Sequence, residues 1–412
     1  MTGSGQSRQD ATGTMMESHN TAKTQLYIGF WNVRTMYDSG RLAQVISEME
    51  RYKLGILGVS ECRWTGSGRM RTITGETILY SGRDDDQHHE GVAVILKKEV
   101  EKCLMEWKPI SSRLLKVRLR GKQTNISLIQ CYAPTNCADE EEKDNFYSLL
   151  QRETERLPRH DLVIIIGDLN AKVGCDNSYY QREMGKHGCG VMNENGSRLA
   201  DFCALHNLII GGTLFQHREI HKLTWYSPND RDRNQIDHIL INSKWTRSLQ
   251  DVKVKRGADV GSDHQLVIAK IKLKLKKQNT KVNNIRKYDI EKLRNPRTKT
   301  MFSIELKNRF QALQDLANEN EENTGSIEES WKSVENTYKE TSMKCLGYKG
   351  IQKKKEWLQP ETWKAIEERR DAKKRYIDSK SERLRERYKQ EYSEAQRKVK
   401  RMARADKRKK YK

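Results

Sequence analysis

The chain has 412 residues and a formal net charge of +22 at pH 7, a length that suits one large α/β domain followed by a second region. No apolar run approaches the roughly 18–20 residues of a membrane span. The cysteines form no Cys-x-x-Cys pair, which disfavours disulfides and zinc and favours a reducing compartment. Residues 271–412 contain 41 Lys and Arg against 22 Asp and Glu (net +19), whereas residues 1–270 contain 37 against 34 (net +3). The basic second part predicts a polyanionic partner. Nucleic acid is the first candidate, and an anionic membrane surface is the second.

Residues 1–24 are predicted to be disordered, because they are polar and lack the apolar core of a signal peptide. Apolar runs and alternations then predict strands mixed with a few helices, which is typical of a layered α/β or α+β domain over residues 25–275. The expected strands are 26–33, 54–59, 91–96, 114–119, 126–132, 162–166, 208–210, 223–226, 236–241 and 266–275. The expected helices are 42–49, the segment after Asn136 to Leu150, and 199–205.

Residues 276–412 are rich in Lys, Arg, Glu and Gln and are predicted to be a mostly helical linker or tail. Helices are expected over 301–316 and 327–345, and Pro360 suits the first turn of a long last helix. The last helix carries a narrow apolar stripe, which suits either weak packing on its neighbours or a partner-binding seam. The stripe consists of Leu384, Tyr388, Tyr392, Ala395, Val399 and Met402.

The segment 162–170 is the centre of the prediction. Residues 162–166 are apolar and mostly β-branched, so they suit a strand buried on both faces. The strand ends in Gly167, and Asp168 and Asn170 follow it. Residues two apart in an extended chain point to the same side, so the carboxylate and the amide are expected to project together. The alternative is a plain turn, because Gly, Asp and Asn all favour turns.

Polar side chains follow several other predicted strands, and sheet proteins place functional groups at strand ends. They are Asn32, Glu61, Tyr132, Asp168 with Asn170, Asp237, and Asp263 with His264. This set suits phosphodiester hydrolysis, in which carboxylates such as Glu61 and Asp263 hold a hard Mg²⁺ through oxygen. His264 could donate to a phosphoryl oxygen if Asp237 fixes its tautomer. Asp168 could orient or deprotonate the attacking water, which Asn170 would position.

Six short motifs stand in the order found in the endonuclease/exonuclease/phosphatase superfamily, and the resemblance covers about residues 25–275. They are Trp31-Asn32-Val33, Ser60-Glu61, Tyr132-Ala133-Pro134, Gly167-Asp168-Leu169-Asn170, Ile236-Asp237-His238 and Gly261-Ser262-Asp263-His264. More narrowly, the chain resembles the apurinic-type endonuclease domain of RTE (BovB-like) non-LTR retrotransposons and the related craniofacial development protein 2-like sequences. Residues 355–358 and 361–363 resemble the segment that leads towards reverse transcriptase in such elements.

The resemblance implies a four-layer α/β sandwich of two packed mixed sheets flanked by helices, and a metal-dependent cut of DNA. The cofactor implied is Mg²⁺, with Mn²⁺ as an alternative. By motif match, the metal ligands are Glu61, Asn32 beside it, and Asp263. The implied catalytic residues are Asp168, Asn170, Tyr132 as a phosphate contact, and Asp237 with His264. Thr224 matches a hydroxyl residue near the cut phosphate in retrotransposon relatives.

Two residues depart from the abasic-repair branch of the superfamily. Arg34 stands where that branch has an Asp, and Thr135 stands where it has an Asn. The first departure removes a possible metal ligand and weakens a repair function. A phosphoinositide-type phosphatase of the same fold is an alternative, but residues 234–238 lack the Trp-Cys-Asp-Arg pattern of inositol phosphatases. A catalytically idle, co-opted nucleic-acid-binding protein is the other alternative.

DNA is the expected partner, with element RNA as a second partner for the basic tail and no membrane. Residues 276–412 carry most of the excess positive charge, and such charge binds DNA without sequence preference. A chain that ends near residue 275 is therefore expected to keep its cleavage pattern while it binds DNA more weakly. Residues 227–235 predict a hairpin loop whose Arg231 and Arg233 either reach the DNA or meet only water. The basic cluster 407–410 suits a nuclear-import signal, so nuclear localisation is expected, with the cytoplasm as an additional compartment.

Overall fold

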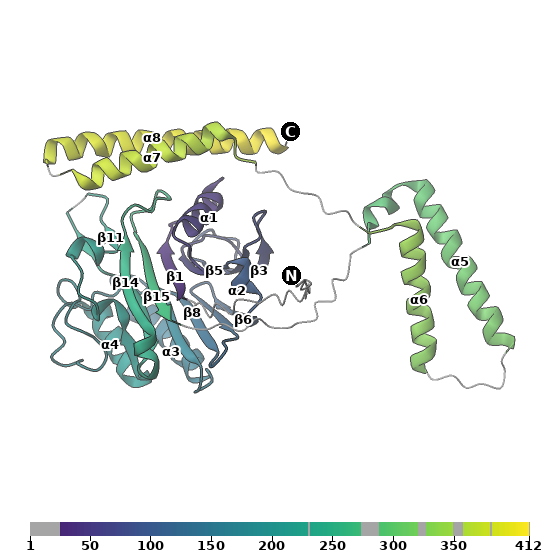
Figure 1. The fold of residues 1–412 in the computed structure, drawn as a ribbon, viewed down its shortest axis with the longest axis horizontal. Helices are drawn as coiled ribbons and strands as arrows, with labels where there is room; N and C mark the ends of the chain where they lie inside the picture. Colours follow the sequence, from purple (N-terminus) through teal and green to yellow (C-terminus); the bar gives the residue numbers. More distant parts are fainter. Residues whose placement is uncertain are drawn as a thin grey trace, which may run out of the picture. The chain divides into compact units, whose positions relative to one another are not determined.

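Two β-sheets form the centre of residues 25–272 in the computed structural model (Figure 1). The first sheet has the order β14-β15-β1-β2-β5-β4-β3, and the second has the order β10-β13-β9-β8-β7-β6. The first contains β1 (Gln25–Asn32), β2 (Ile56–Ser60), β3 (Ser67–Arg71), β4 (Thr77–Ser81), β5 (Val92–Leu96), β14 (Leu249–Lys255) and β15 (Leu266–Lys272). The second contains β6 (Leu104–Ser111), β7 (Leu114–Leu119), β8 (Ile126–Tyr132), β9 (Leu162–Asp168), β10 (Leu208–Ile210) and β13 (Asp237–Asn242).

The structure describes residues 25–229, 231–272, 288–319, 327–348, 357–379 and 381–411. The predicted disordered segment 1–24 and the last three residues of the predicted strand 266–275 lie outside them. The chain divides into two compact units, residues 1–278 with 356–412 and residues 279–355. The predicted tail 276–412 is therefore divided between the units, because its last part packs with the sheet domain. No helix in the described ranges combines the length and the apolar character needed to cross a membrane.

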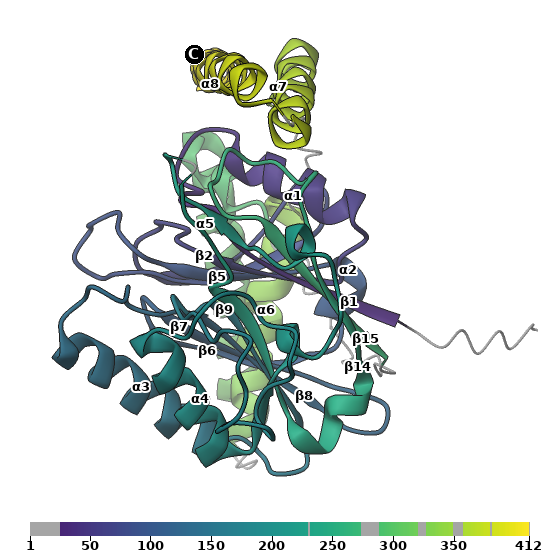
Figure 2. The same cartoon turned by 90° about the vertical axis from the view of Figure 1, so that its left-hand side faces the viewer.

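The layers follow from which faces of the strands are apolar. Ile164 and Ile166 of β9 point into the core between the two sheets. Val163 and Ile165 point outward, against α3 (Glu140–Glu155) and α4 (Glu194–His206). The outer face of the first sheet is covered by α1 (Arg41–Arg51), and a short α2 (Lys98–Glu101) follows β5. Figure 2 shows α1 on one side of the paired sheets and α3 with α4 on the other. The predicted sandwich of two mixed sheets flanked by helices is confirmed.

Four strands of the two large sheets were not predicted from the sequence: β3, β4, β6 and β14. Three of them are edge strands, since β3 and β14 end the first sheet and β6 ends the second. Edge strands face solvent on one side and tolerate charges and proline, which hides the alternation that marks a strand. Ser67–Arg71 is almost wholly polar, and β6 contains Pro109.

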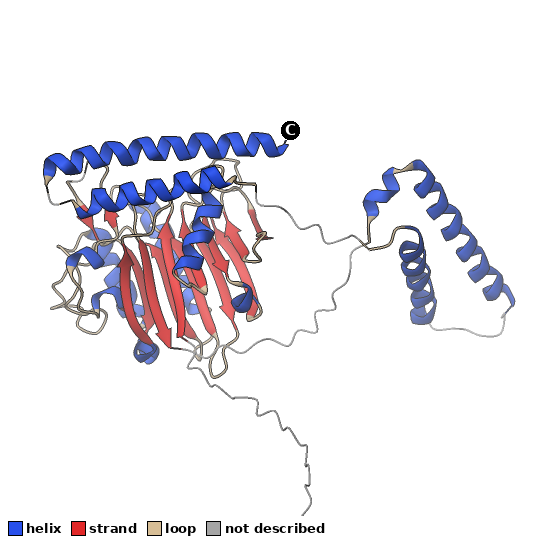
Figure 3. Cartoon of the chain, turned by 45° about the horizontal axis from the view of Figure 1, so that its top comes forward, coloured by secondary structure: helices blue, strands red, loops and turns tan. Residues whose placement is uncertain are grey.

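The last part of the chain forms a helical hairpin and not one long helix. It consists of α7 (Pro360–Asp378) and α8 (Glu382–Tyr411), which lie side by side in Figures 1 and 3. Pro360 occupies the first turn of α7, as predicted. Val399 of the predicted stripe packs against Ala365 and Ile366 of α7, so this part of the stripe is used within the molecule.

The hairpin docks on the sheet domain through a buried ionic network. Arg369 of α7 donates to Asp259 at 2.8 Å, and the side chains of both residues are at most 2% exposed. Lys373 lies 3.4 Å from the same carboxylate, and the Tyr392 hydroxyl of α8 donates to it at 3.1 Å. The loop after Asp259 leads directly to Asp263 and His264. A chain that ends near residue 275 would lack these partners of the buried Asp259 carboxylate.

The second unit is a separate pair of helices. It contains α5 (Pro296–Glu319) and α6 (Ile327–Cys345), preceded by a short 3-10 helix at Ile290–Arg294. The rings of Phe310 and Tyr338 pack edge to face with centroids 5.6 Å apart, and Arg309 pairs with Glu340. Both predicted helices of this region are confirmed.

Candidate active site

The strand-end residues meet because neighbouring strands finish in register. Asn32, the last residue of β1, lies beside the end of parallel β2, and Glu61 follows that strand. In the second sheet, Asp168 at the end of β9 pairs with Tyr132 of parallel β8. Asp168 also pairs with Asp237, the first residue of antiparallel β13. One edge of the sandwich therefore collects side chains from five strands and loops.

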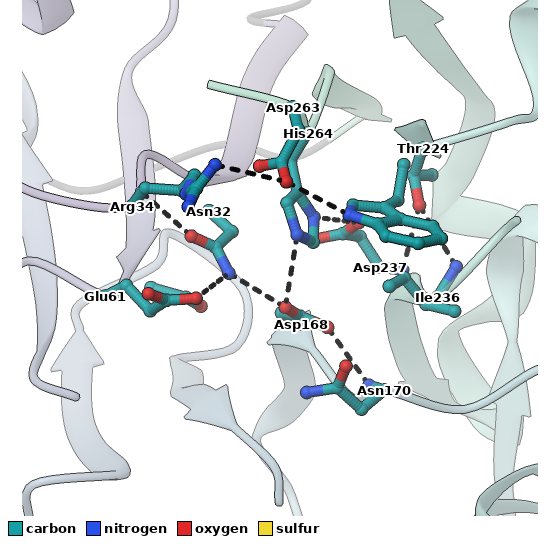
Figure 4. A network of polar contacts seen from close by, with 12 residues as sticks. Asn32, Arg34, Glu61, Asp168, Asn170, Thr224, Ile236, Asp237, Asp263 and His264 are labelled. Carbon is teal, nitrogen blue, oxygen red and sulfur yellow. Dashed lines mark hydrogen bonds and ion pairs between the residues drawn. The ribbon is translucent and has the colours of Figure 1, made fainter. Parts of the chain in front are cut away.

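Asn32 joins the two sheets at this edge (Figure 4). Its Nδ2 donates to Glu61 Oε1 at 2.8 Å and to Asp168 Oδ2 at 2.9 Å, and its Oδ1 accepts from the backbone N–H of Arg34. Because the acceptor oxygen is occupied by a backbone donor, the amide nitrogen is held toward the carboxylates. Asn32 is buried, so these bonds are shielded from water.

The backbone turns sharply at three of these positions. Gly167 has φ 143°, and a Cβ there would lie 2.0 Å from the carbonyl oxygen of Cys131, so only glycine fits. Glu61 and Asn170 adopt left-handed conformations, with φ 52° and 47°. Such conformations cost free energy in non-glycine residues and are common at functional sites. The backbone N–H of Asn170 donates to Asp168 Oδ1 at 3.0 Å, so this turn also fixes the carboxylate.

His264 lies between two carboxylates. Its Nδ1 is 3.0 Å from Asp237 Oδ2, and its Nε2 is 3.7 Å from Asp168 Oδ2. Although burial alone would lower the pKa of His264, Asp237 and Asp168 raise it to about 10. Burial, and then the charge of Asp237, raise the pKa of Asp168. The two carboxylates therefore favour the protonated imidazolium of His264, whose Nε2 lies on the side of Asp168.

The loop that carries His264 is anchored to β1. The Trp31 Nε1 donates to the backbone oxygen of His264 at 3.0 Å. Ser262 Oγ donates to the backbone oxygen of Asn32 at 2.7 Å and accepts from the backbone N–H of His264 at 3.1 Å. These bonds explain why residues more than 200 positions apart lie in one site.

A cavity of about 350 Å³ opens over this network. The predicted site residues that line it are Glu61, Tyr132, Asp168, Asn170, Asp263 and His264, whereas Asn32 and Asp237 lie behind them. Several further lining residues were not predicted from the sequence: Arg63, Asn136, Lys172, Asn193, Trp225 and Asn234. The positions of Arg63 and Lys172, each two residues after a predicted site residue, were a signal that could have identified them.

Residues 29–264 match the Endonuclease/Exonuclease/phosphatase family, a match that covers more than half of the chain. The chain belongs to this family. Craniofacial development protein 2 of Bos taurus is 42% identical over 272 residues, which is 66% of this chain and 45% of that protein. The protein of the same name from Tragulus javanicus is 42% identical over 254 residues, 62% of this chain and 43% of that protein. The chain therefore spans less than half the length of these relatives.

The solved structures that match this chain include an APE2 catalytic domain and a retrotransposon endonuclease domain. The catalytic domain of APE2 from Xenopus laevis gives a TM-score of 0.48 at 17% identity and covers 62% of this chain and 94% of that chain. The endonuclease domain of TRAS1, a telomere-specific non-LTR retrotransposon, gives a TM-score of 0.42 at 15% identity. The match covers 61% of this chain and 99% of that chain. The resemblance to the endonuclease/exonuclease/phosphatase superfamily and to craniofacial development protein 2-like sequences is confirmed.

The oxygen ligands of this family member suit a hard divalent cation. Glu61 and Asp168 converge on one amide nitrogen of Asn32, and the buried Oδ1 of Asp263 has no hydrogen-bond partner. Among the described His, Cys, Asp and Glu residues, one group of three places ligand atoms within 4.8 Å of one another: Asp168, Asp237 and His264. The structure thus brings Asp168 and Glu61 to the same amide group of Asn32, while Asp263 lines the same cavity as both acids.

Asp263 contacts groups other than the predicted ligands. Its Oδ2 accepts from Trp225 Nε1 at 3.3 Å and lies 3.5 Å from the Arg34 guanidinium. Arg34 is 52% exposed at its side chain and has φ 59°. The residue that departs from the abasic-repair branch therefore places a cation beside Asp263, where that branch would place a second acid.

Tyr132 lines the active-site cavity, whereas the hairpin arginines do not. Burial, and then the charge of Glu61, raise the pKa of Tyr132 above its usual range, so its hydroxyl stays protonated and can donate. The Arg113 guanidinium lies 5.1 Å from the centre of its ring. The predicted hairpin contains β11 (Trp225–Tyr226) and β12 (Arg233–Asn234). Arg231 and Arg233 are exposed on it and lie outside the active-site cavity.

Thr224 has a structural role that the motif match did not indicate. The residue is buried, and its Oγ1 accepts from the backbone N–H groups of Ile236 at 3.0 Å and Asp237 at 3.1 Å. These bonds fix the start of β13 and therefore the carboxylate that holds His264. The hydroxyl is thus a positioning group behind the site, and the structure does not bring it to the cavity.

Replacement of Thr224 tests this positioning role. Thr224→Val would leave two buried N–H groups without an acceptor, each at a cost of about 1–3 kcal/mol, so we expect a lower melting temperature and weaker catalysis. Thr224→Ser keeps the acceptor and should restore both. Equal loss in the Val and Ser variants would contradict the role of the hydroxyl, since Val keeps the methyl group but lacks the oxygen, whereas Ser keeps the oxygen but lacks the methyl group.

Proposed function

We propose that the chain is a Mg²⁺-dependent DNA endonuclease of retrotransposon origin that nicks DNA by hydrolysing a phosphodiester bond. The observation that supports this most strongly is the convergence of three groups on one cavity: Asp168, the Asp237–His264 pair, and Glu61 bonded to Asn32. An acid that can accept a proton, a cation that can bind a phosphoryl oxygen and an oxygen ligand set are the parts that phosphodiester hydrolysis requires.

Asp168 is the proposed acceptor of the proton from the attacking water. Its Oδ1 and Oδ2 are held by the Asn170 backbone and by Asn32, so the carboxylate cannot rotate away from the cavity. The raised pKa of Asp168 increases its basicity relative to an exposed aspartate. Asn170 Nδ2 donates to the backbone oxygen of Ala133 at 2.9 Å, which fixes the side chain that would position the water.

His264 is the proposed donor to the phosphate. Asp237 accepts from its Nδ1, so a proton on Nε2 faces the cavity and can be donated to a non-bridging phosphate oxygen. Tyr132, protonated and beside Glu61, would contact the same phosphate. A Mg²⁺ or Mn²⁺ held by Glu61, with Asp263 completing the surrounding acidic network, would stabilise the charge that develops on the phosphate and the leaving oxygen. Asn32 orients the Glu61 carboxylate through its Nδ2 and is not a ligand in this geometry, because its Oδ1 accepts from the Arg34 backbone.

The retrotransposon origin is supported by the ordered motifs of residues 25–275 and by the segment 361–363 that resembles the approach to reverse transcriptase. DNA is the proposed substrate, and element RNA is a second proposed partner of the basic C-terminal region. The cluster 407–410 is exposed at the end of α8, where an import receptor could bind it, so nuclear localisation is proposed as well.

A plasmid assay tests the proposed function. The full chain is incubated with supercoiled plasmid and, separately, with inositol phosphates, each with and without Mg²⁺. We expect relaxed circular DNA only when Mg²⁺ is present, because the proposed cation neutralises developing negative charge. Phosphate release from inositol phosphates without nicking would support the phosphatase alternative. DNA binding without either reaction would support the idle, co-opted protein.

A further inference from the structure

A second cavity, of about 340 Å³, lies between the α7–α8 hairpin and the sheet domain. It adjoins the candidate active site, since Arg34 and Asp263 line both cavities. Its walls come from the β11–β12 hairpin, from the loop at Gly261–Asp263 and from the facing sides of α7 and α8. A polymer chain that crosses the active site can therefore continue into this second cavity along the protein surface.

The second cavity is strongly basic. Its described lining contains one acidic side chain, Asp263, and six cationic ones: Arg34, Arg233, Arg256, Lys373, Arg385 and Lys389. Lys373 is committed to Asp259, and Arg256 donates to the backbone oxygen of Ile377 at 3.0 Å. The excess of cations at a partly enclosed surface attracts a polyanion more strongly than the same charges would on an open face.

Aromatic rings stand among these cations. The Arg233 guanidinium lies 5.5 Å from the centre of the Tyr226 ring, and the Arg385 guanidinium lies 5.6 Å from that of Tyr376. Both tyrosines are half-buried and line the cavity. Sites for single-stranded nucleic acid combine a basic groove with aromatic faces on which bases stack. Base stacking requires unpaired bases, and a cavity of this size suits individual nucleotides and not a double helix.

We propose that this second cavity binds an unpaired DNA strand that continues from the phosphate beside His264. The position of that phosphate rests on the proposed nuclease function, whereas the single-strand preference rests on the cations and rings of the cavity itself. The α7–α8 hairpin thus forms one wall of the DNA path. It gives the enzyme a preference for sites where one strand is already unpaired next to the cut.

Anisotropy of labelled DNA tests the proposal with the full chain in the presence of a chelator, so that no cutting occurs. The probes are a blunt duplex and the same duplex with an unpaired extension of about ten nucleotides, within the usual range of site sizes. The variant Arg385→Gln/Lys389→Gln removes two cations of the cavity. The matched control, Arg383→Gln/Arg397→Gln, removes two exposed cations of the same helix that do not line it.

We expect the cavity variant to bind the extended probe about tenfold more weakly and to lower its salt slope by about 1.4, because each lost phosphate contact lowers the slope by about 0.7. The blunt probe and the control variant should change little. Lys389→Gln alone should give about half the change in slope, so the test does not depend on the double variant alone. The melting curve of the double variant is measured in parallel, to detect misfolding.

Two results would overturn the proposal. If the cavity variant weakens both probes equally, the cations contact duplex DNA; if the control variant matches it, only overall charge is involved. Plasmid nicking by the unaltered chain is measured separately. Absence of nicking with an intact preference for the extended probe would refute the nuclease function alone, whereas nicking without that preference would refute the cavity assignment alone.

Discussion

Asp168→Asn is expected to lower plasmid nicking by at least about 100-fold, the usual scale for loss of a positioned acid or base. The Asn side chain keeps the shape, but its single oxygen can accept from Asn32 or from the Asn170 backbone and not from both. A melting experiment therefore has to separate the missing proton acceptor from a disturbed fold. Glu61→Gln, Asp237→Asn and His264→Ala should give losses of the same order. Asp86→Asn is the matched control, because Asp86 is exposed and its left-handed φ of 57° suits asparagine.

The same variant should behave differently in a melting experiment. The pKa of Asp168 is raised on folding, chiefly by burial, so its ionised form is less favourable in the folded state than in the unfolded one. In the presence of a chelator at neutral pH, Asp168→Asn should therefore melt at or above the temperature of the unaltered chain. A large fall in melting temperature would mean that lost activity reflects a damaged fold and would remove the support for a catalytic role.

The second large effect is expected when the buried ionic network between α7 and the loop before His264 is broken. Arg369→Ala removes the main partner of the buried Asp259 carboxylate, and breaking a buried pair in this way typically costs about 3–5 kcal/mol. Nicking should fall with it, because the loop carries Asp263 and His264. Lys398→Ala breaks a half-exposed pair with Glu368 in the same hairpin and should cost less than about 1 kcal/mol.

Acid unfolding gives an independent measure of how much this buried ionic network stabilises the fold. Although burial alone would raise the pKa of Asp259, Arg369 and Lys373 hold it well below its usual range. A depressed carboxyl pKa contributes stability above the unfolded value of about 3.9, and this stability is lost as the pH falls below it. The unaltered chain should lose stability more steeply below about pH 4 than the double variant Asp259→Asn/Arg369→Met. Parallel acid profiles for the two proteins would contradict the strong coupling of Asp259 to its cations.

Much of the sheet domain was predictable because its central strands are buried on both faces. β9 is an uninterrupted apolar run, and its neighbour β8 is nearly so, whereas the edge strands β3, β6 and β14 carry the polar residues that solvent allows. The grouping of Asn32, Asp168 and His264 was predictable from motif order. The contacts of the Asp263 carboxylate could not be predicted, because they are made with the indole of Trp225 and with Arg34, which a motif does not specify.

The buried ionic network around Asp259 could not be predicted from the sequence. Asp259 and Arg369 are separated by 110 residues, and a pair at that separation produces neither periodicity nor a motif. The same reason explains why the contacts of Thr224 could not be predicted. Its hydroxyl matched a family position, but its actual partners are two backbone groups of the next strand, which become visible only when the strands are placed.

The distance along the chain between Asp259 and Arg369 has a consequence for synthesis. A ribosome adds about 5–20 residues per second, so the 110 intervening residues require roughly 5–20 s. During that interval the nascent polypeptide carries a complete set of motif residues but lacks the helix that neutralises Asp259. The loop ending in His264 can be locked only when α7 has left the ribosome. The proposed nuclease activity is thus expected to be acquired late, and an aborted translation product that stops before residue 360 should be released without the ion pair that fixes its histidine loop.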